Sequence, residues 1–279
     1  MLRVALAVLR GTPQHPVGPD GRMPLSDHFR ELRARVLRAA LVLVAVFVVA
    51  LFFYEELLGL VLDPYNDARA QLDEDVQTMA YVEGATGPLL LQLKLCGVAA
   101  IVISSPYWLS QIWGFVLPGL HRDERRWSRI FAAVAGPLFL AGVATGYYVL
   151  PKGLEVLIGF TPDQLQSLVE FGTYFSFLSR MLLVFGVAFE IPLFVIMLNL
   201  AGVVSGATIG RFRPWIIVGT FIFAAVATPS TDPFSMLALA VPMLLLFVVA
   251  EVVARTIDRV RGLRTAAEPT WADDEASPL

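Results

Sequence analysis

Two acidic residues lie inside strongly basic segments of this chain. Glu31 falls in DHFRELRARVLR and Glu124 in GLHRDERRW. A carboxylate can accept two parallel hydrogen bonds from one guanidinium, a geometry that a lysine ammonium does not offer. The two residues therefore suggest a pair of carboxylates that bind arginines of a ligand. The spacing also allows a solvated helix face on which Glu31 pairs with Arg35, a contact worth roughly 0.3–0.5 kcal/mol.

A third carboxylate, Glu190, lies in the middle of a long apolar run, in AFEIPLF. An ionisable group at membrane depth is energetically costly and is expected to be functional. Glu190 is therefore predicted to contact a partner helix or a wet cavity, and Pro192 frees a backbone carbonyl close by. The alternative is a protonated side chain that fastens two helices of the same chain.

Residue combinations typical of enzymes and metal sites are absent from the sequence. It contains no GxxxxGK[ST], HExxH or GxSxG motif. The single cysteine, Cys96, excludes an intrachain disulfide and a cysteine-based metal cluster, and the three histidines lie far apart. We therefore expect no catalytic residue, no metal and no cofactor, and we expect Cys96 to be a small core residue.

Composition indicates a membrane protein. The chain has 279 residues, of which 57% are hydrophobic and only 16% charged, and its mean hydropathy is +0.68. Soluble domains carry about 25% charged residues. The net charge of −3 provides no basic field for a nucleic acid. These values exclude a soluble globular enzyme, a disordered protein and a nucleic-acid-binding protein.

Several apolar stretches reach or approach the roughly 20 residues that a membrane-crossing helix needs. The predicted fold is accordingly an all-α polytopic membrane protein with six transmembrane helices and both termini in the cytoplasm. The predicted spans are residues 36–54, 95–117, 128–150, 174–200, 215–228 and 234–250.

Positive charge sets the predicted orientation. Most of the 21 Lys and Arg residues precede span one, lie between spans two and three or four and five, or follow span six. The positive-inside rule places that side in the cytoplasm. The outward segment 55–88 is acidic, and Lys94 and Arg180 are expected to extend outward from their span ends. Tryptophans near span ends are expected to anchor the interface: Trp108, Trp113, Trp127 and Trp215.

The last two spans form a short hairpin, helices 5 and 6 of the predicted bundle. Span five has about 14 residues after Pro214, or about 21 Å of helix, against a hydrocarbon core about 30 Å thick. The connecting turn, residues 229–233, is tight. We expect this hairpin to thin the bilayer locally or to leave its turn below the outer surface.

Both ends of the chain differ in composition from the six-span region. Residues 1–22 are expected to be a disordered leader or to precede the true start at Met23. Residues 23–262 form the expected membrane domain. The polar, acidic residues 263–279 are expected to be a disordered cytoplasmic tail.

Four motifs resemble the TatC family, the multispanning subunit of the twin-arginine protein translocase. They are DHFRELRARV before span one, SSPYWLSQIWGFVLPGLHRDERR across span two and its loop, YFSFLSRMLLVFGVAFEIPLFVIML in span four, and ATPSTDPFSM in the short hairpin. The motifs occur in the family's order over about residues 24–255. The resemblance therefore covers most of the chain.

The resemblance implies a function in protein export. TatC proteins recognise signal peptides with paired arginines, and with the single-span subunits TatA and TatB they export folded proteins across the bacterial cytoplasmic membrane, driven by the proton-motive force. The implied partners are TatA, TatB, twin-arginine signal peptides, the lipid bilayer and further copies of TatC. The resemblance implies no enzyme activity.

The resemblance also suggests roles for individual residues. Glu31 and Glu124 match the acidic contacts for the twin arginines, and Glu190 matches the intramembrane glutamate that meets the TatA or TatB helix. The other matched positions form a cytoplasmic signal-peptide patch and an outward-side group. The patch comprises Arg33, Phe115, Pro118, Arg125 and Arg126, and the outward-side group comprises Pro64, Pro88, Lys94 and Asp232.

The sequence departs from the family at Met236, where glutamine is common, and at Arg180, where many members have a neutral residue. Two other functions stay open. An ion-coupled small-solute transporter would use Glu190 as a proton relay, although the internal repeats typical of transporters are absent. A membrane scaffold without a ligand would tolerate Glu31→Ala and Glu124→Ala.

Overall fold

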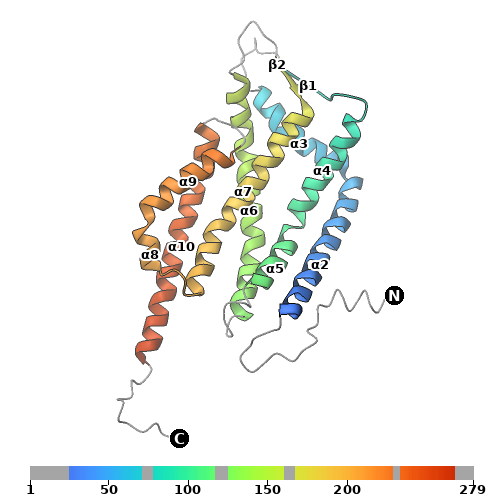
Figure 1. Ribbon diagram of the computed structural model, residues 1–279. Helices are drawn as coiled ribbons and strands as arrows, with labels where there is room; N and C mark the ends of the chain where they lie inside the picture. Colours follow the sequence, from blue (N-terminus) through green and yellow to red (C-terminus); the bar gives the residue numbers. More distant parts are fainter. Residues whose placement is uncertain (1–24, 71–77, 117–124, 160–166, 229–232, 268–279) are drawn as a thin grey trace, which may run out of the picture.

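Long helices running roughly along one direction dominate the computed structural model, which describes residues 25–70, 78–116, 125–159, 167–228 and 233–267 (Figure 1). The leader, Pro118, Glu124 and Asp232 lie outside these ranges. The elements are α2 (Leu25–Phe52), α3 (Tyr54–Ala70), β1 (Thr78–Tyr81), α4 (Gly87–Ile103), α5 (Ser105–Val116), α6 (Arg125–Gly159), β2 (Ser167–Glu170), α7 (Phe171–Leu200), α8 (Gly206–Arg211), α9 (Arg213–Ala227) and α10 (Pro233–Ala267).

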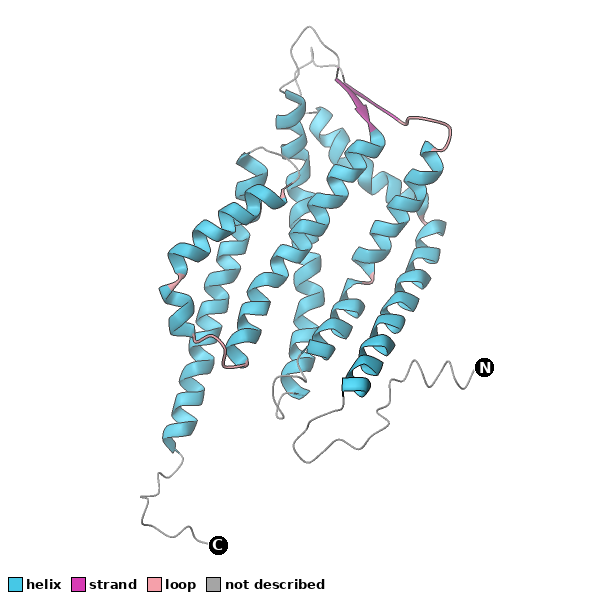
Figure 2. Cartoon of the chain, in the orientation of Figure 1, coloured by secondary structure: helices cyan, strands magenta, loops and turns pink. Residues whose placement is uncertain are grey.

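The bundle has two distinct ends. α2 begins and α10 ends at the lower end of Figure 1, here called the terminal end, and β1 and β2 lie at the opposite, strand end. The strands pair in parallel, with Thr78 opposite Ser167 and Tyr81 opposite Glu170 (Figure 2). The fold is predominantly helical, and this short strand pair is a feature that the sequence analysis did not anticipate. The segment predicted as an outward loop holds helix α3 and a strand whose Thr and Tyr residues favour extended backbone.

Four helical segments are long and apolar enough to cross a membrane: His28–Phe52, Ile130–Gly159, Phe171–Leu200 and Pro233–Gly262. The pair α4 and α5 would add a fifth span, and α9 is a shorter apolar helix of 15 residues. The described residues of all six predicted stretches are mostly helical, and α9 is as short as predicted. α10 continues to Ala267.

The second predicted span is broken near its middle rather than continuous. α4 and α5 meet at an angle of 54°. Pro106, at the second position of α5, has no backbone N–H to continue the α4 hydrogen-bond ladder. The Trp108 indole donates to the carbonyl of Ile101 at 2.9 Å, and the Ser104 hydroxyl donates to the carbonyl of Ala100 at 2.6 Å. The motif SSPYW therefore both breaks the helix and supplies side-chain donors to carbonyls in the last turn of α4.

The centre of the bundle is the contact between α6 and α7. A Cβ atom at Gly142 would lie only 2.5 Å from the carbonyl oxygen of Phe185, and one at Gly146 would lie 3.2 Å from the Phe185 Cβ. A Cβ atom at Gly186 would collide with the ring of Phe139, which is fully buried. Small residues allow membrane helices to approach this closely. The α6 helix also places Gly136 against Pro106 at the α4–α5 break.

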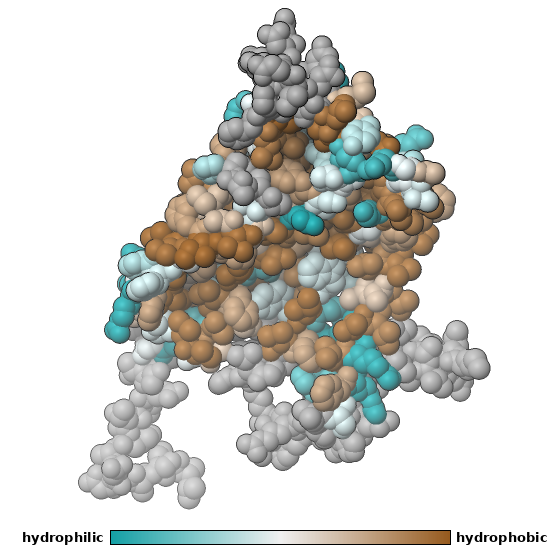
Figure 3. Space-filling view, turned by 45° about the horizontal axis from the view of Figure 1, so that its top comes forward, coloured by the Kyte–Doolittle hydropathy of each residue, from teal (hydrophilic) through white to brown (hydrophobic). Residues whose placement is uncertain are grey.

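Apolar side chains also cover the outside of the bundle. Leu41 on α2, Ile222 on α9 and Leu245 on α10 are each more than half exposed. Figure 3 shows hydrophobic residues over much of the visible face between the two ends. A lipid-facing surface accounts for this exposure, whereas a surface facing water would not favour it.

Replacing Gly142 with alanine tests the helix contact. The added methyl group must displace the backbone at Phe185, so we expect Gly142→Ala to destabilise the protein by about 1–3 kcal/mol, the usual cost of overpacking. Thermal unfolding in detergent micelles measures the change.

Gly97→Ala in α4 is the matched control, because its added Cβ would have open space around it. An alanine there should be neutral or stabilising by about 0.5–1 kcal/mol through helix propensity. Equal unfolding temperatures for the two variants would show that α6 and α7 are not held by this contact.

Candidate functional site

Residues of the HFREL motif in α2 lie against the end of α5 at the terminal end. The rings of His28 and Phe115 stack with their centroids 4.4 Å apart and an interplanar angle of 21°. Two helical turns further along α2, the Arg35 guanidinium lies over Gly114, where a Cβ atom would be 2.6 Å from Nη1. The structure therefore brings Phe115 beside the part of α2 that carries Glu31.

Glu31 pairs with Arg35, as its spacing allows. Arg35 donates from Nε at 2.9 Å and from Nη2 at 2.6 Å, both to the same oxygen, Oε1. The two side chains are about one-quarter exposed or less. No donor to the second oxygen, Oε2, occurs within the described ranges. The carboxylate thus keeps one oxygen for another cation, and it is within reach of solvent.

The structure places the rest of the predicted patch only in part. Arg33 is exposed on α2. Arg125 and Arg126 are the first residues of α6, and their side chains lie outside the described part of the structure. Pro118 and Glu124, in the segment between α5 and α6, also lie outside the described residues. That Glu31 and Glu124 together bind the two arginines of a signal peptide stays a prediction.

Glu190 lies on α7, where it contacts α5. Its Oε2 accepts a hydrogen bond from the indole Nε1 of Trp113 at 3.3 Å. Its Oε1 is buried and has no hydrogen-bond partner among the described residues. A buried acceptor without a donor is costly, on the order of 1–3 kcal/mol. This oxygen is therefore suited to a donor brought by another molecule.

The prediction that Trp113 anchors the membrane interface was wrong. Its side chain is only 6% exposed and packs against Phe131 in a buried cluster, so it is not an anchor at the membrane surface. Trp108 is also turned inward, edge-on to Phe139 with centroids 5.5 Å apart. Trp215 is 72% exposed, as an interface anchor would be. The side chain of Trp127 lies outside the described residues.

At the strand end, the predicted residue Pro64 is fully buried within α3. Its missing N–H leaves the carbonyl of Leu60 without its helical donor. The Tyr147 hydroxyl of α6 donates to that carbonyl at 2.8 Å, and Tyr174 of α7 donates to the carbonyl of Val61 at 2.6 Å. The turn of α3 that contains Pro64 is therefore hydrogen-bonded to the central helices α6 and α7.

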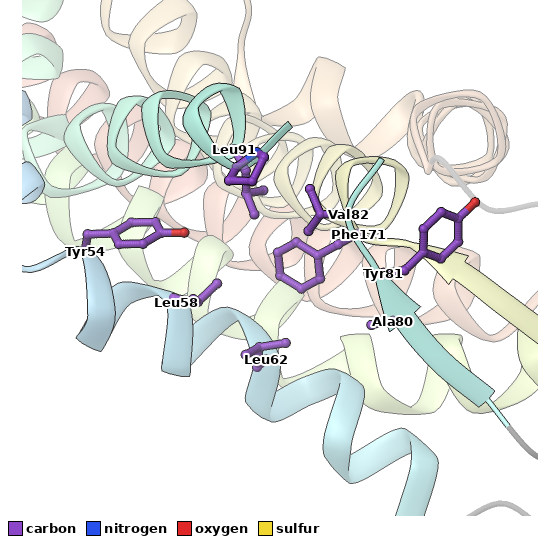
Figure 4. Close-up of a pocket in the computed structure, with 9 residues that line it drawn as sticks. Tyr54, Leu58, Leu62, Ala80, Tyr81, Val82, Leu91 and Phe171 are labelled. Carbon is purple, nitrogen blue, oxygen red and sulfur yellow. The ribbon is translucent and has the colours of Figure 1, made fainter. Parts of the chain in front are cut away.

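Two other predicted outward-side residues are exposed. Pro88 is in the first turn of α4, and it lines a cavity of about 270 Å³ whose other walls are mostly aliphatic and aromatic side chains of α3, β1, α4 and α7 (Figure 4). Lys94 is exposed one to two turns further along α4. Its charge acts on Glu170, the N-cap of α7. Asp232 lies outside the described residues.

Glu170 is a charged helix cap. Its carboxylate accepts hydrogen bonds from the Gly172 amide at 2.8 Å, from the Thr173 amide at 2.6 Å and from the Thr173 hydroxyl at 2.5 Å. The hydroxyl bond from Thr173, the two amide bonds and the positive charge of Lys94 together hold the pKa of the Glu170 carboxyl below its ordinary value. The anion is thus the form that caps α7.

Sequence reasoning missed a polar cluster that joins α9 to α10. Glu251 is buried, and Arg213 donates to both of its oxygens at 2.6 and 2.7 Å. Arg255, one turn along α10, donates to Oε1 at 2.7 Å. The signal was present in the sequence, since Glu251 interrupts the apolar run LLLFVVAEVVAR as Glu190 interrupts its own run.

A second group lies one turn further along α10. Asp258 accepts from the Asn199 side-chain amide at 2.9 Å and from the backbone amide of Gly206 at 2.6 Å. Arg261 donates to the last carbonyls of α7, those of Asn199 and Leu200. These bonds join α7, α8 and α10 at the terminal end. Within the described residues, no group of three or more His, Cys, Asp or Glu is arranged to hold a metal ion.

Comparison with known proteins gives a consistent result. Residues 27–242 match the family "Sec-independent protein translocase protein (TatC)". The chain is 43% identical over 268 residues to a protein of that name from Frankia casuarinae, with 93% of this chain and 74% of the relative covered. It is 34% identical over 263 residues to one from Azotobacter chroococcum, with 93% and 97% covered.

The fold is similar to two crystal structures of the "Twin Arginine Translocase Receptor- TatC". One has a TM-score of 0.63 at 28% identity and covers 83% of this chain and 100% of that structure. The second, in the detergent DDM, has a TM-score of 0.66 at 27% identity and covers 81% and 99%. These matches do not favour the ion-coupled solute transporter considered above.

The charged cap at Glu170 predicts a pH-dependent stability. Because its pKa is lowered in the folded protein, the cap stabilises at pH values above 4.5, the carboxyl's ordinary value, and is lost as pH falls through the lowered pKa. Glu170→Ala should cost about 0.5–2 kcal/mol at neutral pH, as for other N-caps. Thermal unfolding of both proteins across an acid titration measures the effect.

The difference between wild type and Glu170→Ala should disappear at the acid end of that titration, because both then lack the anion. Glu83→Ala, at an exposed position of the same end, should track the wild type throughout. A constant difference between wild type and Glu170→Ala at every pH would contradict a charged cap.

Proposed function

This chain belongs to the TatC family of Sec-independent protein translocase proteins, and we propose that it is the signal-peptide receptor and core subunit of a twin-arginine translocase. In this role it exports folded proteins across the bacterial cytoplasmic membrane with the proton-motive force. The observation that carries the proposal is the surface where the HFREL motif of α2 meets Phe115 of α5, with Glu31 presenting one oxygen that has no donor within the described residues.

The proposed topology has six spans and places the terminal end in the cytoplasm. Four long apolar helices, the bent pair α4–α5 and the short α9 supply the six crossings. An even number of crossings agrees with α2 beginning and α10 ending at the same end (Figure 1). Most arginines lie in segments at that end, as the positive-inside rule requires of a cytoplasmic face.

In the proposed recognition step, the Glu31 carboxylate binds an arginine of the signal peptide in addition to, or in place of, Arg35. In the free protein, Arg35 holds Oε1 of Glu31 and is itself held against Gly114. An incoming arginine binds Oε2, or replaces Arg35 in a bidentate pair. Glu124 receives the second arginine, and Arg33, Phe115, Pro118, Arg125 and Arg126 surround the pair. Phe115, stacked on His28, provides an apolar wall beside the charges.

Glu190 is the proposed contact for a partner helix within the membrane. Trp113 orients the carboxyl through Oε2, and the buried Oε1 accepts a donor from the single span of TatA or TatB. The outward-side residues have a structural role and do not bind the peptide. They are Pro64, Pro88, Lys94 and Asp232. Several copies of this subunit assemble with TatA and TatB in the lipid bilayer.

Peptide binding tests the receptor role. A fluorescent signal peptide with two arginines should bind the detergent-purified protein about 5–150 times more tightly than the same peptide with two lysines, which corresponds to about 1–3 kcal/mol for lost charge-assisted hydrogen bonds. Glu31→Ala and Glu124→Ala should each remove most of this preference.

Glu83→Ala is the control, because Glu83 is an exposed glutamate at the strand end. It should keep the full preference for arginine. Equal binding of both peptides to the wild type would contradict the receptor role of these carboxylates, and so would an unchanged preference in Glu31→Ala and Glu124→Ala.

The short α9 helix is the proposed site of bilayer thinning. Its 15 residues span about 22 Å, less than the roughly 30 Å hydrocarbon core. Adding one turn of leucines to α9 should preserve peptide binding and abolish export of a folded reporter, because the thinned bilayer beside the hairpin is lost. Export at the wild-type rate would show that thinning at this hairpin is not needed.

A further inference from the structure

The arginines where α8, α9 and α10 meet form a second charged surface. Arg213 and Arg255 both bind Glu251, whose side chain is only 4% exposed, whereas their own side chains are 61% and 45% exposed. The carboxylate therefore lies behind the two guanidinium groups and fixes their planes. Arg255 uses only Nε for this contact within the described residues, so both its terminal nitrogens remain for an outside acceptor.

Two glycines let the Arg255 side chain lie flat on α8. A Cβ atom at Gly206 would be 2.8 Å from the Arg255 Cγ, and one at Gly210 would overlap Nη2 and lie 2.8 Å from Oε1 of Glu251. The guanidinium is thus held beside Arg211, the last residue of α8. Arg259 follows one turn after Arg255 on α10. Both flanking arginines are exposed and make no ion pair within the described ranges.

Positive charge exceeds negative charge on this surface. Glu251 is shared between two arginines, and Arg211 and Arg259 add two further charges. The other carboxylate nearby, Asp258, is bound to the Asn199 amide and the Gly206 backbone. The surface therefore attracts an anion, and its exposed guanidinium nitrogens suit a phosphate.

The position of these arginines identifies the kind of anion. On α9, the exposed apolar face that includes Val218 and Ile222 begins directly after Trp215, which is 72% exposed. On α10, the exposed valines Val248, Val249 and Val252 lie before Arg255, and the next exposed valine, Val260, follows Arg259. The arginines thus mark the edge of the lipid-facing surface on both helices. Figure 3 shows hydrophilic residues at the left margin of the molecule, beside a band of hydrophobic residues, in the region of α8 and α9.

We propose that Arg213 and Arg255, held by Glu251 and flanked by Arg211 and Arg259, bind the phosphate headgroup of an anionic phospholipid in the leaflet at the terminal end. The exposed faces of α9 and α10 receive its acyl chains. Basic pockets between membrane helices on the cytoplasmic side are suited to such headgroups. This site is separate from the peptide surface, because α8–α10 and α2 lie on opposite sides of the bundle (Figure 1).

Lipid titration of the purified full chain in neutral detergent tests the site. Phosphatidylglycerol should raise the unfolding temperature at low salt, and phosphatidylcholine should not. The double variant Arg211→Gln/Arg259→Gln leaves both partners of Glu251 in place, and its unfolding temperature without lipid should equal that of the wild type. Its affinity for phosphatidylglycerol should fall about 25-fold, or about fivefold for each arginine, as expected from about 1 kcal/mol per charge near a lipid surface.

The double variant Arg69→Gln/Arg180→Gln is the control, since both arginines are exposed and lie away from this surface. It should bind phosphatidylglycerol like the wild type. The proposal is overturned if phosphatidylcholine protects equally, or if the control loses as much affinity as the test variant. It is also overturned if glycerol phosphate protects at the same concentration as the lipid, because the site would then bind a free anion rather than a lipid.

Discussion

The close packing of α6 on α7 is the contact on which the other elements depend. At Gly142 the two backbones approach so closely that a Cβ atom does not fit between them, and Gly146 lies against the side chain of Phe185. The same α6 helix carries Tyr147, which holds α3, and Gly136, which lies against Pro106 at the α4–α5 break. A shift of α6 would therefore disturb both the strand end and the α5 segment that positions Trp113 and Phe115.

Interrupted helices in an apolar bundle require replacement donors, because no water is present to supply them. Tyr147 donates to the carbonyl that Pro64 leaves free, and Trp108 donates across the break at Pro106. Glu190 differs, since Trp113 satisfies one oxygen and the other has no donor among the described residues. The open oxygen supports the proposal that Glu190 contacts a partner helix.

Much of the fold could be predicted from the sequence, because apolar run length directly reflects bilayer thickness. The Glu31–Arg35 pair and the short α9 also followed from spacing and length. The break at Pro106 was missed, because an apolar run hides a bend that depends on Ser104 and Trp108. The parallel β1–β2 pair joins segments that are far apart in the sequence, and the burial of Trp113 depends on helix packing, so periodicity predicts neither of them.

Recognition of paired arginines by Glu31 is tested most directly by a double-mutant cycle. Glu31→Gln is combined with replacement of each peptide arginine in turn by glutamine, and the four binding free energies of each cycle are compared. A direct contact predicts a coupling energy of about 0.5–3 kcal/mol between Glu31 and one peptide arginine, and much less for the other. Coupling energies of zero for both arginines would contradict a role for Glu31 in reading the signal peptide.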